Sequence, residues 1–144
     1  MLNISFGYTW HAVVMDAKTC TLRDWKDSHA KKFIKGSLVA GLTKGYFANG
    51  KKFGIVQVKD CYRVNTSELA DEDYVNEGFE FYDRYPFLIP PCSPFAKFEN
   101  QQQAFDDWRE QELDMWRLDF NVFEIEPSIL VEVIEMTRKG GLLK

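Results

Sequence analysis

The sequence lacks any hydrophobic run that approaches the roughly 20 residues a membrane-spanning helix needs. Cysteine is scarce: Cys20, Cys61 and Cys92 form no Cys-x-x-Cys pair, and their odd number argues against a disulfide framework. Histidine is scarcer still, with only His11 and His29. Because zinc sites are built from clusters of these two residue types, we predict no metal site and no cofactor.

The remaining composition is that of a folded chain. Apolar residues make up 45% of the 144 positions and aromatic residues 15%, which predicts one globular domain over residues 1–144. The segment 1–6 has no basic region and is typical of a strand rather than of a signal peptide. We therefore expect a cytoplasmic protein without a membrane partner.

Charge is unevenly distributed along the chain. Residues 1–63 hold 11 Lys/Arg against 4 Asp/Glu, a net of +7, whereas residues 64–144 hold 7 against 18, a net of −11. One interpretation is that the two halves attract each other across the fold. The basic half also suits a small anionic ligand or a single strand of RNA. Nonspecific duplex binding is disfavoured, because the whole chain carries a net charge of −4.

Hydrophobic periodicity predicts short helices and strands in alternation. In the expected helix at 28–35, Ala30, Phe33 and Ile34 face inward. The expected helices are 9–16, 28–35, 67–78, 101–116 and 127–138, and the expected strands are 1–6, 19–23, 37–42, 53–64 and 118–126. The connections are too short for a doubly wound sheet. We predict an α+β fold: a small mixed β-barrel, or a strongly curved sheet, with short helices packed around it.

Residues 79–98 hold four of the five prolines among many aromatic residues, which predicts a long packed loop. We expect Phe81, Tyr85 and Phe87 to be partly buried, so that this loop forms a wall or lid beside a binding cleft. The alternative is an exposed patch that docks a protein or a second copy of the chain as a homodimer. In the helix expected at 101–116, Trp108, Met115 and Trp116 are interpreted as core residues.

The segment Lys18–Trp25 is the most informative of the chain. Written as a strand, it places Thr19, Thr21 and Arg23 on one face and Cys20 and Leu22 on the other, with Lys18 at the entrance. The first face suits a cleft for a polar, carbonyl-bearing ligand, and the second suits a core.

The order of four segments resembles the ASCH domain family, whose fold is a PUA-like β-barrel. The segments are Lys18-Thr19-Cys20-Thr21-Leu22-Arg23, Lys35-Gly36-Ser37-Leu38, residues 53–64, and residues 69–79, which end in Glu77-Gly78-Phe79. The resemblance covers residues 2–79 and resumes at 120–125. Residues 80–116 look like an insertion.

This resemblance implies an association with RNA. A bacterial branch of the family consists of acetylcytidine amidohydrolases, which remove acetate from the exocyclic nitrogen of the nucleoside. By resemblance to that branch, Lys18, Thr21 and Glu77 are the catalytic set, and Arg23 matches the arginine of the motif.

The chemistry of amide hydrolysis gives each of these residues a role. Thr21 would attack the acyl carbon, Lys18 would take its proton as a neutral amine, Arg23 would hold the oxyanion, and Glu77 would protonate the leaving nitrogen. Each also has a simpler interpretation: a turn lysine, a strand threonine, a structural ion-pair partner and a solvated carboxylate.

Thr19, Arg23 and Trp25 are the candidate ligand-binding residues. Trp25, Tyr46 and Phe47 are candidate stacking surfaces for a base, although packing in the core or the hairpin is the favoured interpretation. Two functions stay open. The first is a module that binds RNA or a nucleotide through a base in a polar cleft. The second is an amidohydrolase acting on a modified nucleoside such as N(4)-acetylcytidine.

Overall fold

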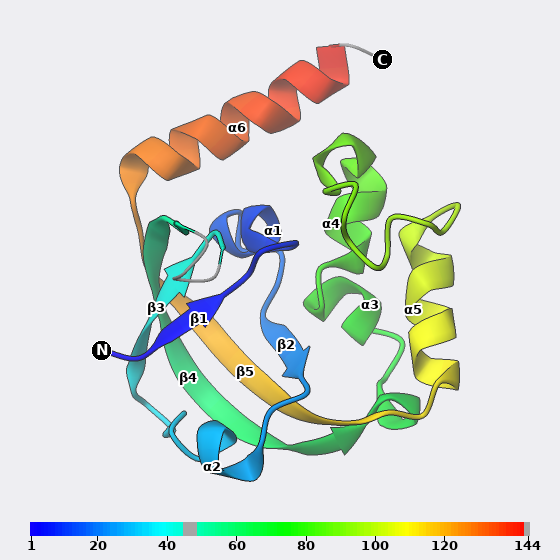
Figure 1. Ribbon diagram of the computed structural model, residues 1–144. Coiled ribbons are helices and arrows are strands. Elements are labelled where there is room, and N and C mark those ends of the chain that lie inside the picture. The colour runs from blue at the N-terminus through cyan, green and yellow to red at the C-terminus, as the bar shows by residue number, and fades with distance from the viewer. Residues whose placement is uncertain (45–48, 143–144) are drawn as a thin grey trace.

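The computed structural model describes residues 1–44 and 49–142, and its strands form one mixed five-stranded sheet (Figure 1). The strands are β1 (Asn3–Ser5), β2 (Cys20–Arg23), β3 (Leu38–Leu42), β4 (Lys52–Asn65) and β5 (Asp114–Ile125). The helices are α1 (Trp10–Val14), α2 (Asp27–Ala30), α3 (Asp73–Asn76), α4 (Phe79–Arg84), α5 (Gln101–Glu110) and α6 (Pro127–Leu142), with short 3-10 helices η2 (Thr66–Glu68) and η3 (Pro86–Leu88).

The strand order is β1-β3-β4-β5-β2, with β1 parallel to β3 and the other neighbours antiparallel. The α+β class is confirmed. The closed barrel is not confirmed, because β1 and β2 are the two edges of the sheet and do not pair with each other within residues 1–44 and 49–142. A side chain joins these edges instead: Arg23 Nη2 on β2 donates to the carbonyl oxygen of Ser5 on β1 at 2.6 Å.

The long strands β4 and β5 bend strongly, and their curvature brings the two edges of the sheet toward each other (Figure 1). The register between them shifts at Ile55/Val56 and again at Val58/Asp60. Such irregularities bend a strand and increase its twist. Gly54 lies at the first bend, where a Cβ atom would collide with the backbone carbonyl of Glu124.

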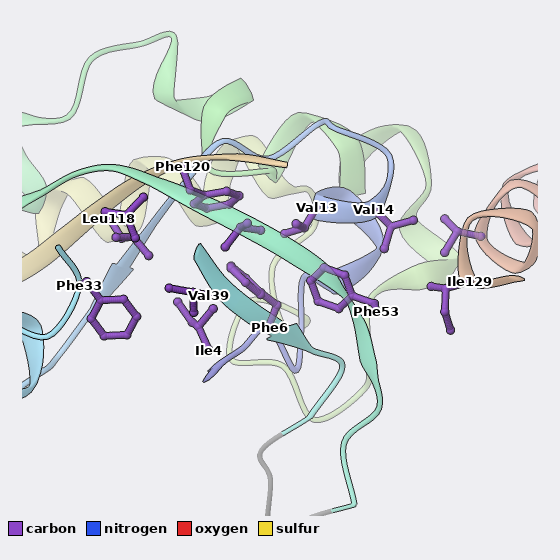
Figure 2. Close-up of a cluster of buried hydrophobic side chains, with 13 residues drawn as sticks. Ile4, Phe6, Val13, Val14, Phe33, Val39, Phe53, Leu118, Phe120 and Ile129 are labelled. Carbon is purple, nitrogen blue, oxygen red and sulfur yellow. The ribbon is translucent and has the colours of Figure 1, made fainter. Parts of the chain in front are cut away.

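The main core lies against one face of this curved sheet, and α1 and α6 contribute to it (Figure 2). Phe6 stands at its centre, with ring centroids 5.9 Å from Phe53 and 5.4 Å from Phe120. Val13 of α1 and Ile129 of α6 belong to the same cluster. Burial of these side chains supplies most of the driving force that fixes β1 and α1 on the sheet.

A second core joins residues 79–108 to β2. It contains Leu22 of β2 and the side chains of α4, α5 and the segment after η2, namely Leu69, Phe79, Ala104, Phe105 and Trp108. Residues 79–98 therefore do not form a continuous loop, as α4 and η3 occupy part of them. Helix α4 ends before Pro86, so the prolines restrict only the chain beyond this helix.

The prediction of a helix at 101–116 is wrong for its last residues, 111–116. Helix α5 ends at Glu110, and Met115 and Trp116 lie in β5, where they pair with Val64 and Arg63 of β4. Glu112, which interrupts the apolar stripe of the sequence, has a left-handed backbone with φ 51°. A non-glycine residue in that region ends a helix.

The helix expected at 67–78 is divided into η2 and α3. Asn65 is the N-cap of η2: its side chain accepts from Ser67 N, and the Glu68 side chain accepts from the Asn65 backbone. The helix expected at 28–35 is shorter, because α2 ends at Ala30, and Ile34 beyond it is 67% exposed rather than buried. The helix expected at 127–138 is longer, because α6 runs through Gly140 to Leu142.

Candidate functional site

A cavity of about 640 Å³ lies where the two edges of the sheet face α4 and the segments around it. Its polar lining includes Lys18, Thr21, Arg23 and Glu77, which come from β2, the turn before it and the end of α3. The structure thus brings together the three expected catalytic residues and the motif arginine. The volume is in the range typical of pockets for small organic ligands.

Lys18 is 3% exposed, and the local backbone holds it in place. Lys18 N bonds to the carbonyl oxygen of Ala12 at 3.1 Å, and Thr19 N bonds to that of Asn76 at 2.8 Å, so the turn is tied to both α1 and α3. The Lys18 Nζ donates to Glu77 O at 2.7 Å and to Glu77 Oε2 at 3.2 Å. Two hydrogen bonds therefore fix the amine at the cavity.

Glu77 is 4% exposed and directly follows α3. The chain turns sharply after it at Gly78, whose φ of 95° is a conformation that favours glycine. One carboxylate oxygen binds Lys18, and the other accepts from the Cys20 thiol at 3.2 Å. Burial and the adjacent Glu77 charge raise the pKa of Cys20, so this thiol stays protonated and acts as the donor.

Arg23 connects the other side of the polar lining. Its Nε donates to Thr21 Oγ1 at 3.1 Å and its Nη2 to the carbonyl of Ser5, while the guanidinium lies 5.3 Å from the centre of the Phe6 ring. Burial lowers the pKa of Arg23 to about 10. The group therefore still carries its positive charge at neutral pH.

Aromatic residues from the segment 79–108 also line the cavity and form its aromatic wall. Phe79, Phe95 and Trp108 all line the cavity, and their ring centroids are 5.1 to 5.8 Å apart. Tyr82 also lines it and bonds to the buried His11 at 3.0 Å. The cavity lining thus combines charged and hydroxyl groups with several aromatic side chains.

Two of the expected ligand-binding residues lie elsewhere. The Thr19 side chain is exposed, because β2 begins only at Cys20 and the alternation of the strand does not extend to the preceding turn. Trp25 stacks on Phe33 at 4.3 Å, and neither Thr19 nor Trp25 lines the cavity. The other two residues expected to stack on a base, Tyr46 and Phe47, lie outside the described residues.

Other lining residues were not expected from the sequence. Tyr8 lies beyond the end of β1, and Trp108 and Met115 had been assigned to packing alone. In the segment expected to form a lid, Phe81 is buried and Tyr85 half-buried, as predicted, but Phe87 is 45% exposed. The high content of aromatic residues in this part of the sequence indicated that it packs against the fold. It does not indicate which of these residues line a cavity.

Residues 1–44 and 49–142 contain no cluster of three or more His, Cys, Asp or Glu side chains arranged to hold a metal ion. Over the same ranges, the structure has no helix with the length and apolar character needed to cross a membrane.

Comparisons with known proteins give a likeness of fold only. No protein-family model matches the chain, and no curated protein matches it. Among solved structures, the protein EF3133 from Enterococcus faecalis V583, described under the family model DUF984, is similar with a TM-score of 0.50. The two share 12% sequence identity over 88% of this chain and 84% of that one. DUF984 proteins are ASCH/PUA-like, so the likeness agrees at the level of fold with the resemblance found in the sequence.

Proposed function

We propose that this protein is an ASCH-type module that binds RNA or a nucleotide by taking a base into the cavity. The observation that carries the proposal is the set of buried polar groups on the cavity lining, where Lys18 and Glu77 pair beside Thr21 and Arg23. A base edge offers both hydrogen-bond donors and acceptors. The Glu77 carboxylate accepts, the Lys18 amine donates, and the Thr21 hydroxyl does either, so this set matches such an edge.

The aromatic wall supports the same ligand class. A flat base stacks on ring faces, which is how proteins hold unstacked bases of single-stranded RNA. Phe79, Phe95 and Trp108 line the same cavity as the polar groups and are the candidates for such stacking. A cavity of about 640 Å³ accommodates one nucleoside or nucleotide rather than a duplex.

Isothermal titration calorimetry with a panel of nucleosides and short single-stranded RNAs tests this proposal. We expect one base to bind with micromolar affinity and expect Glu77→Gln to weaken it by at least about 10-fold. Glu132→Gln, on the exposed face of α6, is the matched control and leaves binding unchanged. Because loss of Glu77 leaves Lys18 unpaired, Thr21→Val is a second variant that retains the ion pair. Absence of binding across the whole panel would contradict the proposal.

The geometry of Lys18 supports a second candidate function, amide hydrolysis on an acylated nucleoside. A neutral amine has two hydrogens and one lone pair. The two hydrogen bonds to Glu77 use two hydrogens, which leaves the lone pair of a neutral Lys18 to accept the Thr21 proton. The Thr21 oxygen then attacks the acyl carbon. The exocyclic amine of the nucleoside leaves after it takes that proton from Lys18. Water hydrolyses the resulting ester.

Product detection with N(4)-acetylcytidine distinguishes this enzyme from a binding module. An enzyme releases cytidine and acetate, and its turnover disappears in Thr21→Val and persists at a reduced rate in Thr21→Ser, which retains a hydroxyl. Turnover in Thr21→Val would exclude Thr21 as the nucleophile. Binding of the intact nucleoside without product would leave the binding module as the function.

A further inference from the structure

The charges on the cavity lining do not balance. Among the lining residues that the structure describes, Lys18, Arg23 and Lys44 are cations and Glu77 is the only carboxylate. Since Glu77 neutralises Lys18, two positive charges remain in a chain whose net charge is −4. Unbalanced charge inside a walled cavity concentrates ions of the opposite sign there.

Arg23 carries one of these charges, and its donors are not all occupied. Within residues 1–44 and 49–142, no carboxylate lies within ion-pair distance of it, and no hydrogen bond from its Nη1 is formed. Arg23 also lines the cavity, so it brings there a guanidinium whose charge no described carboxylate neutralises. An arginine in that position is suited to bind an oxyanion.

Lys44 carries the second charge, at the rim. It is exposed, whereas Lys18 and Glu77 are almost fully buried, so the lining has a neutralised floor and a cationic entrance. The exposed ring of Tyr8 lies on the same lining as Lys44 and Arg23. A ligand with its base on the floor would therefore direct any attached group toward the two cations.

We propose that the ligand carries a phosphate held by Arg23 and Lys44, so that the protein prefers a nucleotide, or a phosphate of an RNA strand, over the corresponding free nucleoside. This inference rests on the proposed function, because the base on the cavity floor sets the position of the phosphate. Arg23 supplies a charge-assisted hydrogen bond in the wall, and Lys44 supplies an exposed charge at the entrance.

Matched titrations test the preference. The four common nucleosides and N(4)-acetylcytidine are each compared with their 5′-monophosphates by calorimetry. We expect the nucleotide of the preferred base to bind about 10-fold more tightly than its nucleoside, the effect of one charge-assisted hydrogen bond. Salt raised from about 50 to about 300 mM weakens nucleotide binding and leaves nucleoside binding nearly unchanged.

Variants then assign the effect to the two cations. Arg23→Gln removes the nucleotide advantage. Because this change also weakens the bond between β2 and β1, Lys44→Gln serves as a second variant at an exposed position. It reduces the nucleotide advantage about threefold without affecting nucleoside affinity. Lys31→Gln, an exposed lysine outside the cavity, is the matched control and changes neither affinity.

The outcomes separate the two proposals and the two sources of phosphate. A nucleoside that binds as tightly as its nucleotide overturns the phosphate site and leaves the base-binding function intact. Failure of both ligands contradicts both proposals. A short RNA that competes more strongly than the mononucleotide assigns the site to a strand phosphate, and the reverse order assigns it to a free nucleotide. Inorganic phosphate that competes as well as the nucleotide would overturn the role of the base.

Discussion

At the scale of single residues, the molecule is notable for charge placed where water is excluded. Lys18 and Glu77 are 59 positions apart in the chain, and both are almost fully buried. Burying a charge is costly unless its partner and further hydrogen bonds satisfy it. Here the Glu77 backbone carbonyl and the Cys20 thiol supply those further bonds. A pair of this kind contributes little net stability, so stability alone does not explain its place beside a cavity.

Removing one partner of this pair should destabilise the fold strongly. Lys18→Met leaves the Glu77 carboxylate buried without its cation, which we expect to cost about 3–5 kcal/mol of unfolding free energy. In the double variant Lys18→Met/Glu77→Gln, the loss should be smaller than in the single variant. Urea unfolding measures both, with the exposed Lys31→Met as control. An unaffected Lys18→Met protein would show that the pair is not buried in solution.

The pH dependence of stability should report on His11. Burial lowers the pKa of His11 from 6.5 to about 4, so between these values the unfolded chain binds a proton that the folded chain does not. Stability therefore rises with pH through this window, and acidification through it costs up to about 3 kcal/mol. Urea midpoints measured at several pH values should show this slope in the wild type. The slope should flatten in His11→Gln, and an identical slope in both proteins would assign the dependence to other groups.

At the scale of elements, prediction from the sequence worked where periodicity was unambiguous. The strand expected at 53–64 is β4 and the helix expected from Pro127 is α6, because each has a clear period and a clear start. The prediction was wrong at Met115 and Trp116. Their spacing from Trp108 fits the period of a helix, but both residues belong to the strand that follows, β5. Glu77 was predicted through a family resemblance. Periodicity describes neighbours along the chain, so it could not predict that Glu77 contacts Lys18. The cavity wall from residues 79–108 depends on tertiary packing and could not be derived.

The turn between α3 and α4 should be sensitive to any side chain at position 78. Gly78 has a φ of 95°, and an added Cβ atom would lie 3.5 Å from Ala12 and Lys18, which is ordinary contact. The cost of Gly78→Ala is therefore conformational, about 1–2 kcal/mol, and it should weaken ligand binding by shifting Glu77. Thermal unfolding and calorimetry measure the two effects. Gly7→Ala, without a positive φ, is the control for the unfolding measurement, and equal losses of stability at both positions would contradict this explanation.

At the scale of the whole molecule, residues 79–108 take part in the cavity and in the core. Phe79, Phe95 and Trp108 line the cavity together with Lys18 and Glu77, and the second core joins this segment to Leu22 of β2. The cavity lining thus comes from segments that are far apart in sequence.

This arrangement predicts that residues 79–108 and the sheet unfold together as one domain. Phe105 is fully buried in the second core, and Phe105→Ala should cost about 3–5 kcal/mol of unfolding free energy. Far-ultraviolet circular dichroism and tryptophan fluorescence should show one coincident transition in the wild type and in the variant. Two separate transitions would show that residues 79–108 form an independent unit.

The most direct test of the central claim is a titration of ¹⁵N-labelled protein with the nucleosides, nucleotides and short RNAs, monitored by two-dimensional NMR. The account predicts that one base shifts the backbone signals of Thr21, Arg23 and Gly78 and the indole signal of Trp108, because these residues surround one cavity. Shifts confined to the exposed face of α6 around Val131, or no shifts with any ligand, would contradict it.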